Sequence, residues 1–350
     1  MSASAPCRSE PHAAPPARLL RAGVIGLGVG TAHLEAYSAH PRCRVVAICD
    51  LDCAKREAAR RGDAAVRSFE HADELLADPE IDVVSIASYD DKHAEQTLAA
   101  LRAGKHVFVE KPLCLNRDDA RRIRTALRER PGLRLSSNLV LRVCPRFAAL
   151  KQRIDAGELG DLFSIEGDYL YGRLHKITHG WRGQIDGYSV VLGGAIHIVD
   201  LMLWLTDDAV TEVFALGNQI ASRGSQFRYR DQTLVLLRFE SGLIGKVGVS
   251  YGCVRPHFHA LSVYGTRGTW VNDTPHARWY DSRDPKREPR LVDDPYPGVH
   301  KGALLAGFID AILSGGECAV TEDDVFRCLS VCLAIEDSAA TGQPVRVEYI

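Results

Sequence analysis

The pattern of hydrophobic and polar residues divides the chain into two parts. From residue 21 to 138, short apolar runs alternate with longer stretches rich in Ala, Arg, Glu and Leu. Six runs predict strands, and three of the stretches between them predict helices: strands at 22–26, 44–49, 64–67, 82–87, 106–110 and 133–137, helices at 51–61, 92–103 and 117–128. Strands and helices in this alternation form a parallel, doubly wound sheet of the dinucleotide-binding type.

The second part of the chain has a different pattern of hydrophobic and polar residues. After a helix and a strand, a long apolar helix is followed mainly by alternating strands, and two helices close the chain: helices at 147–156, 196–205, 301–314 and 322–341, strands at 162–171, 211–216, 232–239, 245–251, 259–264 and 268–272. This pattern predicts an α+β domain with a mainly antiparallel open sheet. We therefore expect an α/β protein with a Rossmann domain at 20–140 and a second domain at 141–350.

Composition narrows the possible classes. The 43 basic and 45 acidic residues nearly cancel, which argues against a nucleic-acid-binding surface. No apolar run has the length of a membrane span, and residues 1–19, rich in Ala, Pro and Ser, lack the apolar core of a signal peptide, so we expect a disordered leader. The ten cysteines form no Cys-x-x-Cys pair, which predicts a reduced, cytoplasmic protein without a metal site.

A glycine-rich turn follows the first predicted strand. Gly26 permits a tight bend, Gly28 lets the backbone approach a pyrophosphate, and the following helix offers free N–H groups. Val29 belongs to the same turn. Thr31 stands where the strict pattern has its third glycine, and Gly30 comes one residue early.

An acidic residue at the end of the second strand fits the same cofactor. Asp50 follows the turn by about twenty residues, as a ribose-binding carboxylate does. A carboxylate there hydrogen-bonds ribose hydroxyls and repels a 2′-phosphate, so we expect NAD rather than NADP. Lys55 and Arg56 would weaken that preference if they reached the ribose, although a solvated helix face explains them as well.

The strand at 106–110 ends in a potential catalytic group. Its apolar run stops directly at Glu110, Lys111 and Pro112. A buried parallel strand brings its last residues to the carboxyl edge of the sheet, where open α/β folds bind ligands. Lys111 could exchange a proton there, and Pro112 stiffens the turn that carries it. A surface lysine after a strand is the simpler alternative.

Four segments together resemble the Gfo/Idh/MocA oxidoreductases. These are residues 26–33, Asp50, residues 104–112 and residues 193–200, and the resemblance extends over about 20–345. It implies a nicotinamide-dependent enzyme that oxidises or reduces a hydroxyl or carbonyl group of a sugar or cyclitol. It also implies that the second domain binds substrate and mediates a homodimer or homotetramer.

The resemblance assigns roles by position. Lys111 matches the family's catalytic lysine, and His197 matches a histidine that touches the reacting hydroxyl. The Lys111–Pro112 segment lies beside the nicotinamide in relatives, so Glu110, Lys111 and Pro112 are expected to contact the cofactor. Ser88 and His93 match the cofactor side of the site, although a local hydrogen bond at a helix N-terminus would also explain His93.

One position departs from the family pattern. Many sugar and cyclitol dehydrogenases of the family carry an aspartate four residues before the histidine, and here that residue is Gly193. Asp186 and Asp200 are the nearest carboxylates in sequence, and the counterpart of Asp200 looks structural. We therefore expect Lys111 to be the principal acid and base.

Residues 168–188 combine aromatic, basic and acidic side chains in one short segment. Aromatic faces can stack on sugar rings, polar tips can bind hydroxyls, and Arg or Lys would also suit a carboxylate or phosphate on the substrate. A solvated loop with one anchoring Trp is the alternative. The residues expected to bind substrate are Tyr171, Arg173, Lys176, Trp181, Arg182, Asp186 and His197.

Three functions remain open on sequence grounds. The first is an NAD-dependent dehydrogenase acting on a sugar, sugar derivative or cyclitol. The second is an enzyme that uses transient oxidation by a tightly held NAD to cleave a glycoside or eliminate a group, as some relatives do. The third is a non-catalytic dinucleotide-binding regulator, against which the retained Lys111 and His197 argue.

Overall fold

A six-stranded parallel sheet organises the N-terminal part of the computed structural model, which describes residues 19–60 and 62–350. The strand order β3-β2-β1-β4-β5-β6 reverses between β1 and β4, as in dinucleotide-binding folds, so the predicted fold class is confirmed. Its elements are β1 (Leu20–Ile25), α1 (Gly30–Ala39), β2 (Cys43–Cys49), α2 (Cys53–Arg60), β3 (Arg67–Phe69), α3 (Ala72–Ala77), β4 (Val83–Ile86), η1 (Asp90–Lys92), α4 (His93–Arg102), β5 (His106–Val109), α5 (Arg117–Arg128) and β6 (Leu135–Ser137).

A nine-stranded sheet organises the C-terminal part, in the order β14-β13-β12-β11-β7-β10-β9-β8-β15. The sheet is mainly antiparallel, as the sequence predicts, and β7 and β10 form a parallel pair within it. The elements are η2 (Val140–Val143), α6 (Pro145–Asp155), β7 (Leu162–Leu170), α7 (His175–Thr178), η3 (Trp181–Gln184), η4 (Val191–Ala195), α8 (Ile196–Thr206), β8 (Val210–Asn218), β9 (Gln232–Phe239), β10 (Ile244–Ser250), β11 (Phe258–Gly265), β12 (Thr269–Val271), β13 (Ala277–Tyr280), β14 (Arg290–Val292), α9 (Leu305–Ser314), α10 (Glu322–Thr341) and β15 (Val345–Arg346).

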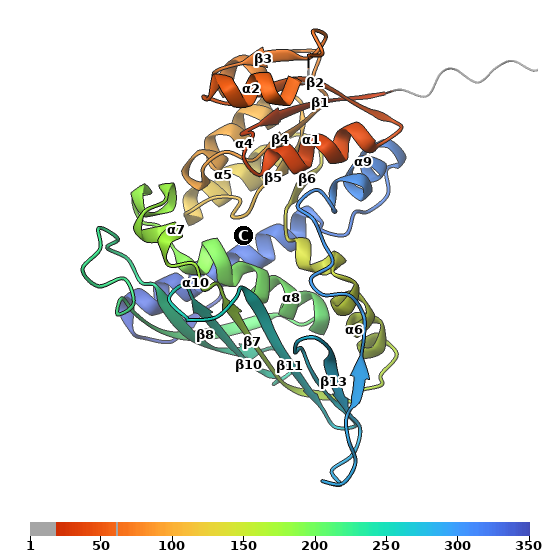
Figure 1. Ribbon diagram of the computed structural model, residues 1–350, viewed down its shortest axis with the longest axis vertical. Coiled ribbons are helices and arrows are strands. Elements are labelled where there is room, and N and C mark those ends of the chain that lie inside the picture. Colours follow the sequence, from red (N-terminus) through yellow and green to blue (C-terminus); the bar gives the residue numbers. More distant parts are fainter. Residues whose placement is uncertain (1–18, 61) are drawn as a thin grey trace, which may run out of the picture.

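Helices α8 and α10 separate the two sheets (Figure 1). They cover the face of the large sheet that is turned toward the N-terminal domain, and no helix formed by the described residues covers the other face. Helix α9 returns to the N-terminal domain and packs against α1, and the ring of its Phe308 lies 5.6 Å from that of Phe108 in β5. The boundary near residue 140 stays a prediction, because the end of the chain contributes to both halves.

Predicted and observed boundaries differ most at two elements. Strand β3 begins at Arg67 instead of residue 64, and α9 begins at Leu305 instead of residue 301. The second shift leaves Lys301 in a loop above the site. The predicted leader lies outside the described residues except for Leu19. Within the described ranges, no helix has both the length and the apolar character needed to cross a bilayer.

Candidate active site

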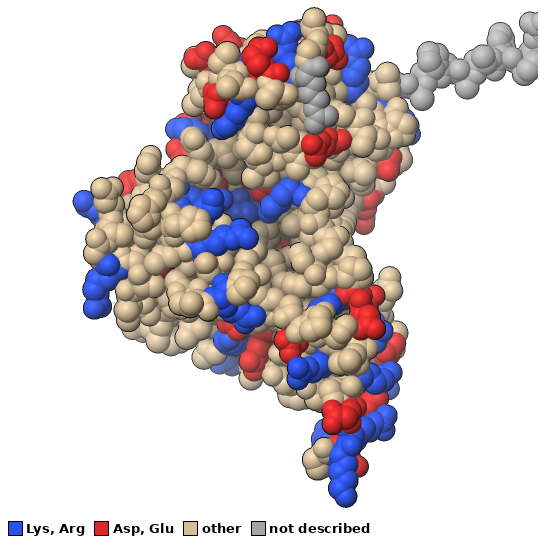
Figure 2. Space-filling view, viewed as in Figure 1, with Lys and Arg blue, Asp and Glu red and all other residues tan. Residues whose placement is uncertain are grey.

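The end of β5 brings Lys111 into the space between the two sheets. The strand is fully buried from Val107 to Val109, and Lys111 follows at its carboxyl edge with 9 % of its surface exposed. Its Nζ donates a hydrogen bond to the carbonyl oxygen of Gly193 in the π-helical segment η4, 3.0 Å away. Lys111 thus links the two domains. Figure 2 shows a hollow between them in which Lys and Arg side chains gather.

Burial changes the acid–base chemistry of Lys111. Desolvation lowers its pKa below the ordinary value of 10.5, Asp90 and Glu110 oppose the shift, and the charges of Lys301 and Arg182 add to it. A lysine with a lowered pKa is neutral more often near physiological pH than a surface lysine. Lys111 can therefore accept a proton from a bound hydroxyl group.

Glu110 remains ionised beside it. Burial alone would raise the pKa of Glu110, but a hydrogen bond with His33 and the charges of Lys301 and Lys111 lower it overall. Asn138 Nδ2 donates to Glu110 Oε1 at 2.6 Å and to the Lys301 carbonyl at 2.8 Å. The network ties the end of β5 to α1 and to the Lys301 loop, so Glu110 supports the site from below rather than facing an open space.

His93 holds the turn that carries Lys111. The ring is fully buried at the start of α4, with Nδ1 2.7 Å from the Pro112 carbonyl and Nε2 3.3 Å from the Ser88 carbonyl. The shorter contact is best satisfied by an Nδ1–H donor. Ser88 Oγ is itself bonded to Gln96. Both predicted cofactor-side residues are therefore engaged within the protein, which favours a positioning role for His93.

His197 lies at the second position of α8, 5 % exposed and surrounded by rings. Tyr169 stacks on it at 6.0 Å with an interplanar angle of 22°, and the His259 ring lies 6.3 Å away edge-on. Burial lowers the pKa of His197 well below 6.5, and the charge of Lys111 lowers it further. The imidazole is neutral at pH 7, and its Nδ1 is buried without a partner among the described residues.

Two tyrosine hydroxyls occupy the space beside Gly193. Tyr188 and Tyr251 share a buried hydrogen bond of 3.1 Å. A Cβ added to Gly193 would lie 2.3 Å from the Tyr188 hydroxyl and 3.0 Å from that of Tyr251. No side chain fits at this position unless the tyrosines move. The two hydroxyl groups therefore explain why a glycine stands where many enzymes of the resembled family carry an aspartate.

The predicted substrate-binding segment is only partly brought to the site. Tyr171 is buried and stacks on Tyr169 at 5.7 Å, and Trp181 meets Tyr89 of the N-terminal domain at 4.8 Å. The exposed Asp186 accepts a hydrogen bond from Tyr229 at 2.6 Å instead, and Lys176 is exposed on α7.

The other carboxylate considered from the sequence is structural. Asp200 is 1 % exposed and receives a bidentate contact from Arg142, the shortest distance being 2.6 Å. Arg142 also pairs with Asp324 at 3.0 Å. Arg142 and Asp200 thus join η2, α8 and α10. Among the described residues, no group of three or more His, Cys, Asp or Glu side chains is arranged to hold a metal.

The glycine turn has the shape that a dinucleotide requires. Gly26 has a φ of +84°, and a Cβ there would meet the Ala87 carbonyl oxygen at 2.4 Å. A Cβ at Gly28 would meet nothing within 4 Å, so the backbone is open to a ligand. At Gly30 it would lie 3.0 Å from Val24, which reflects close packing of α1 on β1. The chain therefore fits a bound NAD between this turn and Lys111.

Two residues of the turn carry internal hydrogen bonds. Asp50 Oδ2 accepts from the Leu27 N–H at 2.7 Å, and Oδ1 accepts from Asp52 N–H at 2.9 Å. The Thr31 hydroxyl donates back to the Leu27 carbonyl at 2.7 Å. Asp50 keeps free lone pairs at the end of β2, whereas Thr31 holds the turn itself. Val29 is half-exposed beside it.

Several residues of the site could not be assigned from the sequence. The charge of Lys301 lowers the pKa values of Glu110, Lys111 and His197, although this lysine follows a long irregular segment. The Tyr251 ring lies 6.3 Å from Tyr169, and the His257 ring 4.9 Å. The local sequence signal for this part of the site is the run of basic and aromatic residues at 255–259, which includes His257.

Comparisons with known proteins agree with this geometry. Residues 20–138 match the family model described as "Oxidoreductase family, NAD-binding Rossmann fold", and residues 147–271 match the "GFO/IDH/MocA C-terminal domain". A 1,5-anhydro-D-fructose reductase of Ensifer adhaerens is 30% identical, over 81% of this chain and 84% of that protein. The chain belongs to the Gfo/Idh/MocA oxidoreductase family. Its N-terminal domain is an NAD-binding Rossmann fold, as the sequence predicts.

Other Gfo/Idh/MocA proteins extend the comparison over nearly the whole chain. The scyllo-inositol 2-dehydrogenase (NAD(+)) of Bacillus subtilis (strain 168) is 26% identical over 94% of this chain and 96% of that one. The solved structure of a levoglucosan dehydrogenase in complex with NADH and levoglucosan superposes with a TM-score of 0.84. It is 24% identical and covers 95% of this chain and 100% of its own, so it supports the fold alone.

Proposed function

We propose that this oxidoreductase transfers hydride between NAD and a secondary hydroxyl or carbonyl of a sugar, sugar derivative or cyclitol. One observation carries the proposal: a buried lysine with a lowered pKa, at the carboxyl edge of the Rossmann sheet, contacts the segment that leads into His197. The names of the sugar and inositol relatives support the substrate class. NAD is the expected cofactor because Asp50 would repel a 2′-phosphate.

When bound, the nicotinamide ring supplies the hydride acceptor or donor. In the oxidative direction, neutral Lys111 accepts the proton of the substrate hydroxyl, and in the reductive direction its ammonium form returns that proton. The neutral His197 imidazole hydrogen-bonds the same oxygen, held in place by the Tyr169 ring. Glu110, Ser88, His93 and Pro112 fix the turn around Lys111. Gly26, Gly28, Val29, Gly30, Thr31 and Asp50 would hold the cofactor.

A screen for reduced nicotinamide tests this function. The protein would be incubated with NAD or NADP in separate reactions against sugars, inositols, their oxidised acids and, with NADH, the corresponding ketones. We expect absorbance of NADH to rise with NAD on at least one polyol. Product formation without net NADH would favour the redox-cycling enzyme, and NAD binding without any turnover would favour the regulator.

We also propose that a second copy of the chain covers the free face of the large sheet, giving a homodimer or homotetramer. Large apolar side chains are exposed on neighbouring strands there, including Leu216, Leu234, Leu236 and Ile244, each more than half exposed. Leu234 and Leu236 alternate with buried residues along β9. Leu236→Lys should shift the mass in solution toward the monomer, whereas an unchanged mass would remove this face as the interface.

The reducing cytoplasm is the compartment that suits the chain best. Every described cysteine is free, and burial raises the pKa of several, among them Cys43 and Cys49 to about 12. Such thiols stay protonated and unreactive. Fractionation of the native organism's cells would test this placement, and recovery outside the cytoplasm would refute it.

A further inference from the structure

Four cationic side chains gather at the cleft between the domains: Lys111, Lys301, Arg173 and Arg182. Among the residues that the structure describes, none of Lys111, Lys301, Arg173 and Arg182 forms an ion pair with a carboxylate, although the charges of Asp90 and Glu110 reach Lys111 and that of Asp90 reaches Arg182. Their positive charges reach the same group of buried side chains. Lys301 and Lys111 lower the pKa of His197, and Arg173 lowers the pKa of His257. Arg182 lowers the pKa of Lys111. Figure 2 shows the same concentration of positive residues in the hollow.

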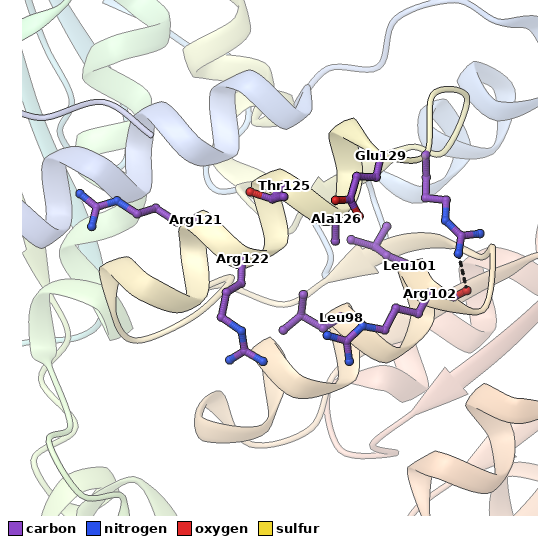
Figure 3. A pocket seen from close by; sticks show the side chains of 9 residues that line it. Leu98, Leu101, Arg102, Arg121, Arg122, Thr125, Ala126 and Glu129 are labelled. Atoms are coloured by element: carbon purple, nitrogen blue, oxygen red, sulfur yellow. Dashed lines mark hydrogen bonds between the residues drawn. The ribbon is translucent and has the colours of Figure 1, made fainter.

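A cavity elsewhere in the molecule provides the contrast. It lies between α4 and α5, has a volume of about 360 Å³ and also contains several arginines (Figure 3). There Arg122 pairs with Asp119 at 2.7 Å, Arg121 lies 3.6 Å from Asp118, and Arg130 donates to the Arg102 carbonyl at 3.1 Å. In that cavity Arg121 and Arg122 pair with carboxylates, whereas none of the four cations of the cleft has a carboxylate within ion-pair distance among the described residues.

The two cleft arginines are held on aromatic faces. The Arg182 guanidinium carbon lies 4.4 Å from the centre of the Trp181 ring, and that of Arg173 lies 5.2 Å from the centre of the Tyr171 ring. Stacking occupies the flat face of a guanidinium and leaves its N–H edge available. An N–H edge of this kind matches the two oxygens of a carboxylate or phosphate.

The backbone that carries these arginines is tightly wound. A Cβ at Gly183, next to Arg182, would lie 2.0 Å from the Ile177 carbonyl oxygen, and one at Gly172, next to Arg173, 1.9 Å from that of Arg255. Both glycines are needed for the close approach of two chain segments. The arginines are therefore placed by a built scaffold, not by a loose loop.

We propose that the substrate is an anionic sugar, whose carboxylate or phosphate binds Arg182 and Arg173 while its hydroxyl group faces Lys111. This inference rests on the proposed dehydrogenase and narrows its substrate class. Lys301 is not included in the proposed anion site. The next residue, Gly302, packs against Ala32 in the first turn of α1, so the Lys301 charge lies where it can also interact with the cofactor. Asp90 is a carboxylate near the site whose charge raises the pKa of Arg182 without forming an ion pair with it.

Binding measurements separate the charge from the ring. D-Glucuronate, D-galacturonate and D-mannuronate would be titrated into the protein saturated with NADH, each beside its methyl ester, which has the same ring without the charge. The binding signal is the change in tryptophan fluorescence, to which Trp181 contributes as one of four tryptophans. In at least one configuration the acid should bind about tenfold to a hundredfold more tightly than its ester, the worth of a charge-assisted contact. Hexose 6-phosphates beside the free hexoses form the phosphate arm.

Matched variants assign the effect. Arg182→Gln should abolish the preference for the acid, while Arg128→Gln, an exposed arginine at the end of α5, should keep it. A preference found only in the phosphate arm, and lost in Arg182→Gln, would name phosphate as the anion. Equal binding of charged and neutral partners in every pair would overturn the inference, and so would an Arg182→Gln variant that keeps the preference for the acid.

The outcome for the dehydrogenase is read separately. Tight, Arg182-dependent binding of an acid without any NADH formation on adding NAD would retain the anion site and reject the proposed reaction. Turnover of neutral sugars with no preference for charged ones would retain the reaction and reject the anion site.

Discussion

Replacing Gly193 with alanine tests whether the tyrosine pair shapes the site. The added methyl group would lie 2.3 Å from the Tyr188 hydroxyl oxygen, 2.9 Å from its Cζ and 3.0 Å from the Tyr251 hydroxyl oxygen. Overpacking of this kind costs about 1–3 kcal/mol. The exposed Gly307 in α9 is a matched control, because a Cβ there would meet nothing within 4 Å. Gly307→Ala should gain about 1 kcal/mol from helix propensity alone.

Urea unfolding followed by tryptophan fluorescence measures the difference between the two variants. We expect the free energy of unfolding of Gly193→Ala to be lower than that of Gly307→Ala by about 2–4 kcal/mol, the overpacking cost plus the helix-propensity gain of the control. Turnover should also fall, since the Gly193 carbonyl that holds Lys111 moves, and a displacement of about 1 Å can cost about a hundredfold. In the Tyr188→Phe background the penalty should shrink, because the closest contact is gone. Equal stability of both alanine variants with normal turnover would refute this reasoning.

Three further predictions concern charge. Asp50→Asn should weaken NAD binding by about tenfold or more and reduce the preference for NAD over NADP, measured as the ratio of kcat/KM for the two cofactors. An unchanged ratio would show that Asp50 does not select between the cofactors. Alcohol oxidation should increase with pH as Lys111 loses its proton, with a midpoint below 10.5, and a midpoint at or above that value would contradict the burial effect. The pKa values of His257 and His259 are lowered, chiefly by burial, to about 4 and about 3, from 6.5. The unfolded chain therefore binds protons that these two imidazoles do not bind in the folded protein. The free energy of unfolding should decrease as the pH falls from 6.5 to 5, and it should decrease less in His259→Gln. A free energy of unfolding that does not change over this range would show that the imidazoles are charged in the folded protein.

Local signals explain which elements were predictable. Helices α5 and α10 begin at the predicted residues because side-chain caps mark them: Asn116 accepts from the Asp119 N–H, and Thr321 forms a capping box with Asp324. Strand β3 was misplaced because it is a three-residue edge strand with no alternation to mark it. The short strands β13, β14 and β15 were missed for the same reason, since pairing across the sheet defines them more than their own residues do.

The residues of the site likewise differ in whether local sequence signals predict their placement. Lys111 and the glycine turn are encoded within a few consecutive residues, so their placement could be anticipated. Lys301 and Tyr251 reach the site only through tertiary packing, from segments that are distant in sequence. The role of Gly193 was equally hidden, because the atoms that exclude a side chain there belong to Tyr188 and Tyr251. Sequence spacing also suggested Asp186, whose carboxylate bonds Tyr229 instead.

The most direct measurement compares turnover and cofactor affinity in Lys111→Met. Methionine preserves most of the buried volume and removes the group that exchanges the proton. With a substrate found in the screen, kcat should fall by about a hundredfold to ten-thousandfold, the usual contribution of general acid–base catalysis, while the Kd for NADH changes little. Near-normal turnover in a folded Lys111→Met variant would show that another group moves the proton, and the proposed role of Lys111 would be wrong.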